Sequence, residues 1–200
     1  MNSEEDPQVD VARLLPARTG HFLLESGHHG ELWLDLELLC LRPGRVQRLA
    51  DRLAALLAKH AVDVVCGPLV EGAFVGLMVA SVLEVPFTYS KPYVDVNEGL
   101  FPVKYAIPPV LRPEVRGRRV AIVNDVINAG SAVRGTLIDL RDQGAVPVVF
   151  GTLAVLGHAA GRLAADAGVA LERLATIPNE IWPPADCPLC ARCVPLVEQT

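Results

Sequence analysis

Residues 119–136, RVAIVNDVINAGSAVRGT, combine an apolar run, an acidic residue and a loop of small residues. Residues 120–123 are entirely apolar and lead directly into Asn124 and Asp125. In open α/β sheets, ligands bind at the carboxyl ends of the strands. An ionised Asp125 can accept hydrogen bonds from two adjacent hydroxyls of a sugar. A helix expected at about 132–143 would present free N–H groups to a phosphate at its start. The pattern predicts a phosphosugar site.

The loop between strand and helix supplies the rest of this site. Gly130 lets the backbone approach a ligand closely. We expect the phosphate to be held by Asn128, Ala129, Gly130, Ser131 and Ala132. A structural interpretation stays open, in which Asn128, Ser131 or Asp125 only caps an ordinary helix.

The surrounding pattern predicts the sheet that positions this loop. Apolar residues at helical spacing favour a helix at 45–60, and a small-residue helix runs to about 83. Further strands are expected at 62–66, 85–89 and 146–155, and a further helix at 159–167. This alternation is typical of right-handed βαβ units and an open, mostly parallel α/β sheet with helices on both faces. Since 120–123 lacks polar alternation, it is expected to be a central strand.

The two ends of the chain do not follow this alternation of strands and helices. Short strands around Phe22 and Trp33, together with a proline-rich tail, predict a small hood over the carboxyl ends of the sheet. We therefore expect one domain over 1–200, with a core at 44–175 and a hood formed by 1–43 and 176–200.

Composition and charge argue against several classes of protein. A net charge of −5 argues against nonspecific nucleic-acid binding, which needs a basic surface. Residues 1–10 are acidic and polar, unlike a signal or transit peptide. No apolar run reaches the length of about 18 residues that a membrane span needs. The expectation is a cytoplasmic protein without membrane contact.

Five cysteines do not indicate a disulfide scaffold in a chain of 200 residues. Cys187, Cys190 and Cys193 form a CxxCxxC run that could indicate zinc or an iron–sulfur cluster. No fourth ligand is close in the sequence, and Cys40 and Cys66 lie in apolar runs. The prediction is a rigid structural tail without metal, and a CxxC redox protein is a weaker alternative.

Residues 90–117 form a long connection with five prolines and little periodicity. A connection of this length is typical of a lid. Two of the three lysines in the chain, Lys91 and Lys104, lie in it, so it could close over a diphosphate and supply cations. A solvated hairpin with ordinary surface lysines is the alternative.

Several segments resemble one family. Residues 119–136 resemble the diphosphoribosyl-binding motif of type I phosphoribosyltransferases. Residues 20–27, GHFLLESG, are similar to the N-terminal segment of orotate phosphoribosyltransferases, and 66–87 to the region of their diphosphate loop. The tail, with Cys187-Pro188-Leu189-Cys190, also resembles theirs. The resemblance covers most of the chain, in order.

This resemblance implies transfer of phosphoribosyl from 5-phosphoribosyl 1-diphosphate to a nucleobase, orotate or a related one, in pyrimidine biosynthesis. It implies Mg²⁺ bound mainly through the substrate diphosphate, and a homodimer in which the lid reaches the neighbouring site. The transition state resembles an oxocarbenium ion, so the charges at ribose and leaving group must both be stabilised. The residues implied are Asp125, Lys91 and Lys104 as catalytic; Asn124, Asp125 and 128–132 for ribose and 5-phosphate; Leu69, Val70, Glu71 and Gly72 for diphosphate; and Glu25 and His158 for the base.

The chain departs from the family pattern at several of these positions. Asn124 replaces an acidic residue, and Asn128 and Ala129 replace threonines. Glu71 stands where the family has Gly or Lys, and a carboxylate about 5 Å from a phosphate charge costs roughly 3 kcal/mol.

The base-binding positions and the lid depart as well. Gly157-His158 replaces an Asp-Arg pair, and Glu25 replaces Lys or Thr. The lid has Tyr93-Val94-Asp95-Val96 in place of Lys-Asp-His-Gly. Two hypotheses follow: an enzyme of this family, or a weakened paralogue that binds a phosphosugar or nucleotide as a sensor or regulator.

Overall fold

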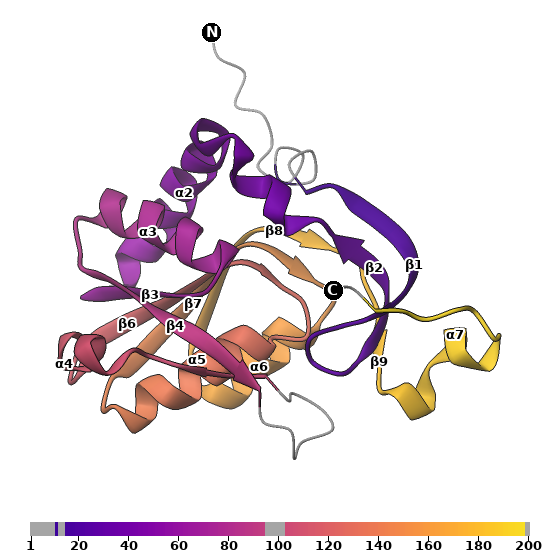
Figure 1. The fold of residues 1–200 in the computed structure, drawn as a ribbon. Coiled ribbons are helices and arrows are strands. Elements are labelled where there is room, and N and C mark those ends of the chain that lie inside the picture. Colours follow the sequence, from indigo (N-terminus) through magenta and orange to yellow (C-terminus); the bar gives the residue numbers. More distant parts are fainter. Residues whose placement is uncertain (1–10, 12–14, 95–102, 199–200) are drawn as a thin grey trace, which may run out of the picture.

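A six-stranded sheet forms the centre of the computed structural model, which describes residue 11, residues 15–94 and residues 103–198. Its strand order is β5-β4-β3-β6-β7-β8 (Figure 1). All neighbouring pairs are parallel except β4 and β5 at one edge. The strands are β3 (Val64–Pro68), β4 (Phe87–Val94), β5 (Val103–Ala106), β6 (Arg119–Ile127), β7 (Val146–Leu156) and β8 (Ala170–Ile177).

Helices cover both faces of this sheet. Helices α2 (Pro43–Leu57) and α3 (Glu71–Leu83) lie on one side, and α5 (Ser131–Asp142) and α6 (Ala159–Ala167) on the other (Figure 1). The predicted fold class, an open, mostly parallel α/β sheet with helices on both faces, is confirmed. The shorter helical elements are η1 (Leu36–Leu41), η2 (Ala58–His60), η3 (Pro109–Leu111), α4 (Arg112–Val115), η4 (Pro184–Asp186) and α7 (Pro188–Ala191). Among the described helices, none combines the length and the apolar character needed to cross a membrane.

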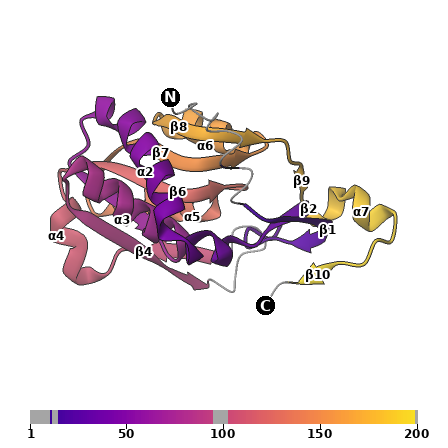
Figure 2. The same cartoon turned by 90° about the horizontal axis from the view of Figure 1, so that it is seen from above.

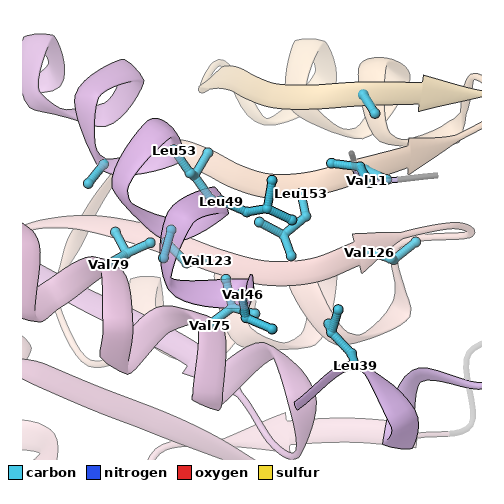
Figure 3. Packing of buried hydrophobic residues seen from close by; sticks show 14 of the residues in the cluster. Val11, Leu39, Val46, Leu49, Leu53, Val75, Val79, Val123, Val126 and Leu153 are labelled. Carbon is cyan, nitrogen blue, oxygen red and sulfur yellow. The ribbon is translucent and has the colours of Figure 1, made fainter. Parts of the chain in front are cut away.

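Strand β6 is central, as its uniform apolar pattern predicts. Ala121 and Val123 pack in the cluster beneath α2 and α3, whereas Val120 and Ile122 pack in the cluster on the side of α5 and α6. Figure 3 shows Val123 of the first cluster among side chains of the covering helices. Full burial of each such side chain contributes about 1.5–3 kcal/mol. This double anchoring fixes the carboxyl end of β6, where Asn124 and Asp125 lie.

The hood is a second, four-stranded sheet with the order β10-β1-β2-β9. Strands β1 (Ala17–Leu23) and β2 (His29–Leu34) form an antiparallel hairpin. Strand β9 (Ile181–Trp182) pairs with β2, and β10 (Val197–Glu198) pairs with β1. Figure 2 shows this sheet beside the core, next to α7. The predicted hood is thus built from both chain ends.

Two parts of the fold differ from the sequence-based expectation. Strand β8 was not predicted; it is an edge strand whose Glu172 and Arg173 interrupt the apolar pattern. The lid segment, 90–117, was expected to be a long connection with little regular structure, with a solvated hairpin as the alternative, and its described part contains a pair of antiparallel strands. Strand β4 continues through Pro92 to Val94 and pairs with β5. A proline is tolerated there because this is an edge region, and pairing satisfies the neighbouring backbone groups. Residues 95–102 and 1–10, on which the lid and leader predictions also rest, lie outside the described residues.

Candidate functional site

A cavity of about 340 Å³ lies between the carboxyl ends of β3 and β6 and the hood. Hood residues such as Leu24, Trp33 and Leu36 line one side of it. The cavity lining also includes most of the residues predicted from the sequence to bind ligand. These are Glu25, Leu69, Val70, Glu71, Gly72, Asn124, Asp125, Asn128, Ala129, Gly130, Ser131 and Ala132.

Asp125 is a buried carboxyl in this cavity. Its side chain is 4% exposed, and its Oδ2 atom has no hydrogen-bond partner. Burial, reinforced by the negative charge of Glu71, raises the pKa of Asp125 to about 7. A buried polar atom without a partner is costly in the free protein, and a ligand hydroxyl that reached it would relieve this cost. Asp125 therefore has the chemistry to bind a hydroxylated ligand.

The preceding residue, Asn124, is held by contacts inside the protein. Its Nδ2 donates a hydrogen bond to the Val126 carbonyl, at 2.8 Å. Its Oδ1 faces Gly72 in the first turn of α3, so closely that a Cβ at Gly72 would collide with it. Asn124 thus packs directly against the start of α3, and this packing requires glycine at position 72.

Helix α5 begins beside Asp125 without a side-chain cap. Its N-cap residue is Gly130 in the left-handed conformation, with φ of 86°, and no side-chain hydrogen bond caps the helix. The capping interpretation of Asn128 and Ser131 is therefore wrong. Asn128 instead accepts a hydrogen bond from Asn179, at 3.1 Å. The first-turn N–H groups of α5 are available to an anion, as the phosphosugar prediction requires.

Glu25, in the β1–β2 turn of the hood, connects the hood to this helix start. Its carboxylate accepts hydrogen bonds from Ser131 Oγ, at 2.6 Å, and from the Tyr105 hydroxyl, at 3.0 Å. Burial and the charge of Glu25 raise the pKa of Tyr105. Tyr105 lines the cavity but was not predicted, because only the pairing of β5 with β4 brings it there. The nearest signal in the sequence is an aromatic residue directly after Lys104.

Residues 69–72 form the second wall of the cavity and comprise the two residues between β3 and α3 and the first two residues of α3. The peptide bond between Leu69 and Val70 is cis, and the Leu69 N–H donates to the Ser90 carbonyl at 3.0 Å. Glu71 is the first residue of α3. The loop therefore presents backbone groups and one carboxylate to the cavity.

The cavity is acidic. Of the described residues that line it, four are carboxylic acids and none is lysine or arginine: Glu25, Glu37, Glu71 and Asp125. The predicted cationic residues lie elsewhere in the described part of the chain. Lys91 is exposed, 5.8 Å from the centre of the Tyr89 ring, Lys104 lies on β5, and the exposed His158 precedes α6. None of the three lines the cavity.

A parallel α/β sheet, a buried carboxyl with one partnerless oxygen at the end of its central strand and a helix start without a side-chain cap lie together under a hood, an arrangement typical of α/β proteins that bind a phosphorylated ligand at the carboxyl ends of the strands. No protein-family model matches the chain. A curated relative from Pelotomaculum thermopropionicum, named orotate phosphoribosyltransferase, is 32% identical over 184 residues, which are 90% of this chain and 88% of the relative. The chain belongs to the type I phosphoribosyltransferases, a family of glycosyltransferases, and within it is most similar to the orotate enzymes.

Comparison with solved structures agrees with this family assignment. The crystal structure of orotate phosphoribosyltransferase from Aeropyrum pernix has a TM-score of 0.63 and 25% identity, covering 80% of this chain and 88% of that chain. Adenine phosphoribosyltransferase from Thermoanaerobacter pseudethanolicus has a TM-score of 0.65 at 17% identity, covering 84% and 99%. The second match shows the shared fold alone.

Proposed function

We propose that this protein transfers the phosphoribosyl group of 5-phosphoribosyl 1-diphosphate to orotate or a related nucleobase and releases diphosphate, as a step of pyrimidine biosynthesis. The observation that carries the proposal is Asp125, a buried carboxyl with a partnerless oxygen, next to the uncapped start of α5. Relatives named orotate phosphoribosyltransferase support the choice of base.

The proposed binding mode follows the geometry of the cavity. Asp125 would accept hydrogen bonds from the ribose hydroxyls. The 5-phosphate would lie on the N–H groups of residues 128–132, which lead into α5. The diphosphate would lie against 69–72, where the backbone between β3 and α3 faces the same cavity. These three contacts would hold the ribose with C1 turned toward the hood.

The reaction needs no nucleophile from the protein. A ring nitrogen of the base attacks C1 of the ribose and loses its proton to water or to the departing diphosphate, and the bond between C1 and the diphosphate oxygen breaks, with its electron pair leaving on diphosphate. Positive charge builds up at C1 and its ring oxygen in the transition state, so nearby carboxylates stabilise it. Asp125 is placed for this, provided that it is ionised.

The residues present fit a magnesium ion bound with the substrate. Magnesium takes oxygen ligands and usually keeps water and substrate phosphates in its shell. Glu71 and Asp125 are the oxygen donors that would face it from the two walls of the cavity. When bound, it would neutralise the diphosphate. Because no lysine or arginine side chain lines the described cavity, we propose that substrate binding depends strongly on this ion.

The base would lie beneath the hood. Trp33, Leu36 and Leu24 offer apolar surface there, and Glu25 offers a carboxylate. Glu25 and His158 stay predictions as base-binding residues. So do Lys91 and Lys104 as catalytic residues, which would have to approach from a moving lid or from a second copy of the chain.

A homodimer is part of the proposal. Helix α3 is apolar on nearly all sides, yet Val70, Phe74 and Leu77, at its start and outer face, are 52%, 45% and 53% exposed. Such a stripe is typical of a surface covered by a partner. Light scattering should give twice the chain mass for the natural protein and the monomer mass for Leu77→Glu. A monomeric natural protein would contradict this part. The cytoplasmic location stays a prediction.

A second function is favoured by one observation. In the free protein the Glu25 carboxylate accepts a hydrogen bond from Ser131 Oγ. This hydroxyl is the group expected to bind the 5-phosphate, so Glu25 competes with the phosphate for it. A paralogue that binds a phosphosugar or nucleotide as a regulator, without turnover, would tolerate such competition better than an efficient enzyme.

Two measurements separate these functions. Calorimetry should detect binding of 5-phosphoribosyl 1-diphosphate in the presence of magnesium and not in its absence. Diphosphate release should then follow the addition of orotate, with uracil and adenine as comparison bases. Binding without release for every base would favour the regulator, and the absence of any binding would contradict both functions.

A further inference from the structure

Four side chains far apart in the sequence meet in the hood. They are His21 on β1, His29 on β2, and Cys187 and Cys190 at the start and within α7. Each offers one ligand atom, and these four atoms all lie within 4.8 Å of one another. His21, His29 and Cys187 are buried, and Cys190 is exposed. We call these four residues the His–Cys cluster.

The spacing of the cluster matches one metal geometry. The Nε2 of His21 lies 3.0 Å from Nδ1 of His29 and 3.4 Å from Sγ of Cys187. The Sγ of Cys190 lies 3.3 Å from Nδ1 of His29 and 3.8 Å from Nε2 of His21. For zinc with bonds of about 2.05 Å to nitrogen and 2.3 Å to sulfur, neighbouring ligand atoms of a tetrahedron are roughly 3.3–3.8 Å apart. These four separations agree with that range to within a few tenths of an ångström, and the two pairs that remain, His29–Cys187 and Cys187–Cys190, lie within 4.8 Å.

The surroundings of the cluster also suit a metal. The second ring nitrogen of His21, Nδ1, lies 2.8 Å from the Val194 carbonyl. If Nδ1 carries the proton and donates it there, Nε2 presents its lone pair to the cluster. Cys187 is the N-cap of α7 and Cys190 lies one turn later, with the Ala191 N–H bonded to the Cys187 carbonyl at 3.2 Å. This tight turn directs both thiols to one point.

The charge and the type of the four ligands indicate which metal ion the cluster would bind. Two thiolates and two neutral imidazoles balance the charge of a divalent cation, so the loaded cluster is neutral, as a largely buried site requires. A tetrahedral set of two sulfur and two nitrogen ligands is typical of zinc. All four positions are filled by protein, which is the composition of a structural site without an open position for substrate.

We propose that His21, His29, Cys187 and Cys190 bind one Zn²⁺ ion as a structural site that fastens the C-terminal tail to the β1–β2 hairpin. Binding would release the protons of the two thiols. The expectation of a metal-free tail rested on the lack of a fourth ligand close in the sequence, but in the fold β1 and β2 bring two histidines to the cysteines. Cys193 is exposed and is not part of the cluster.

The site has a consequence for the cavity. The β1–β2 turn that follows His21 carries Glu25, which contacts Ser131 and Tyr105. Beyond the turn, β2 contributes Trp33 to the cavity wall. The zinc site would hold this wall in place from the side opposite the cavity. The proposal itself does not depend on the proposed function, because it is tested without substrate.

The first test is the metal content of the full chain, purified and kept under a phosphine reductant. Mass spectrometry of the metal should find one zinc per chain, retained after dialysis. Cys187→Ser, Cys190→Ser and His29→Ala should each lose at least about nine-tenths of it. The matched control is Cys193→Ser, which removes the third cysteine of the same run and should keep the full equivalent. Cys190→His, at the exposed position, replaces one ligand by another and should retain zinc.

Two further readouts keep the test decisive if a variant fails to fold. Cobalt added to the chelator-treated natural protein should produce the intense visible bands of a tetrahedral site and the ultraviolet thiolate-to-cobalt band. Removing zinc should lower the melting temperature by roughly 5–15 °C, and re-addition should restore it.

Three outcomes would overturn the proposal. The first is a reduced protein with neither zinc nor a cobalt–thiolate band. The second is equal loss of zinc in Cys193→Ser and Cys187→Ser. The third is a Cys187–Cys190 disulfide that persists, in the intact mass, under the reductant.

Discussion

The cavity and the His–Cys cluster lie on two sides of the same hood, but they are assembled in opposite ways. The part of the cavity around Asp125 comes from one continuous segment, 124–132, placed by the strand β6 and the helix α5. The cluster comes from two chain ends, with His21 and Cys187 separated by 166 positions of sequence. The residues around Asp125 can be recognised in the sequence as a motif, whereas the cluster can be recognised only from contacts in the folded structure. A local sequence motif therefore points to the residues around Asp125 but not to the cluster.

The two regions also differ in how their polar groups are satisfied. The cluster atoms of His21 and His29 have partners within the cluster, whereas Asp125 Oδ2 has none. A site for exchangeable substrate must leave groups unpaired for it, and a permanent site can have them paired within the protein. Variants at each site should therefore give different and separable effects.

The largest expected effect is the loss of activity in Asp125→Asn. The amide cannot stabilise positive charge or accept two hydroxyl hydrogen bonds as a carboxylate does, so kcat/KM for phosphoribosyl transfer should fall roughly 10²–10³-fold. Zinc content should be unchanged, because the cluster does not contact residue 125. Asp142→Asn, at the exposed end of α5, is the control and should keep full activity. Activity within threefold of the natural protein in Asp125→Asn would remove Asp125 from the proposed mechanism.

The same variant should change how stability depends on pH. The pKa of Asp125 is about 7 in the folded protein and 3.8 as the ordinary value, so folding binds a proton between about pH 4 and 7. The associated stability is present below pH 4 and is lost as pH rises through 7, an effect on the order of 2–4 kcal/mol. Asparagine does not titrate.

Without substrate, Asp125→Asn should therefore gain stability relative to the natural protein as pH rises from 5 to 8, measured by urea unfolding. If the difference in unfolding free energy between Asp125→Asn and the natural protein did not change over this pH range, the raised pKa of Asp125 would be contradicted.

A smaller effect is expected for Gly72→Ala. The new Cβ would collide with Asn124 Oδ1 and displace the side chain that packs against the start of α3, which costs about 1–3 kcal/mol in the free energy of unfolding. Gly161→Ala is the matched control, because a Cβ there meets nothing within 4 Å in the helix α6, and it should stabilise by up to about 1 kcal/mol. Hydrogen exchange should increase around β6 and α3 and stay unchanged in the hood. Equal stability of the two variants would contradict the packing described.

The smallest effect is expected for Glu25→Gln, where the hood contacts the helix start. Removing the charge next to Ser131 should tighten binding of 5-phosphoribosyl 1-diphosphate about five- to tenfold in calorimetry. The gain stays below that of a fixed charge pair, because this exposed side chain can rotate away. Tyr105→Phe removes the other hydrogen bond of Glu25 but keeps its charge, and should change the affinity less than twofold. Weaker binding in Glu25→Gln would indicate that Glu25 contacts the substrate favourably.

Local pattern predicts much of this fold, and the reason is visible in the central unit. An uninterrupted apolar strand and a helical period depend only on neighbouring residues, so the expected helix at 132–143 lies one residue from the observed Ser131–Asp142. The predicted helix 159–167 has the bounds of α6. Residues 124–132 and 69–72 meet in one cavity because parallel strands end at one edge of the sheet.

The elements that were missed depend on contacts between distant segments. Strand β8 carries Glu172 and Arg173, and its pairing with β7 is what makes it a strand. The lid hairpin and Tyr105 depend on the edge of β4, and Glu25 reaches Ser131 across 106 positions of sequence. The His–Cys cluster is the extreme case, since neither histidine is near a cysteine in the chain. No local period encodes such pairings, which arise only from the tertiary fold.

Phosphorus NMR of a single sample tests the proposed reaction most directly. The full chain is mixed with 5-phosphoribosyl 1-diphosphate and magnesium, and orotate is added to it. We predict that the diphosphate ester resonances disappear after this addition, while free diphosphate and one nucleotide monophosphate appear in equal amounts, and that Asp125→Asn slows this at least about a hundredfold. Unchanged substrate resonances with orotate, uracil and adenine alike would contradict the assignment of this protein as an active phosphoribosyltransferase.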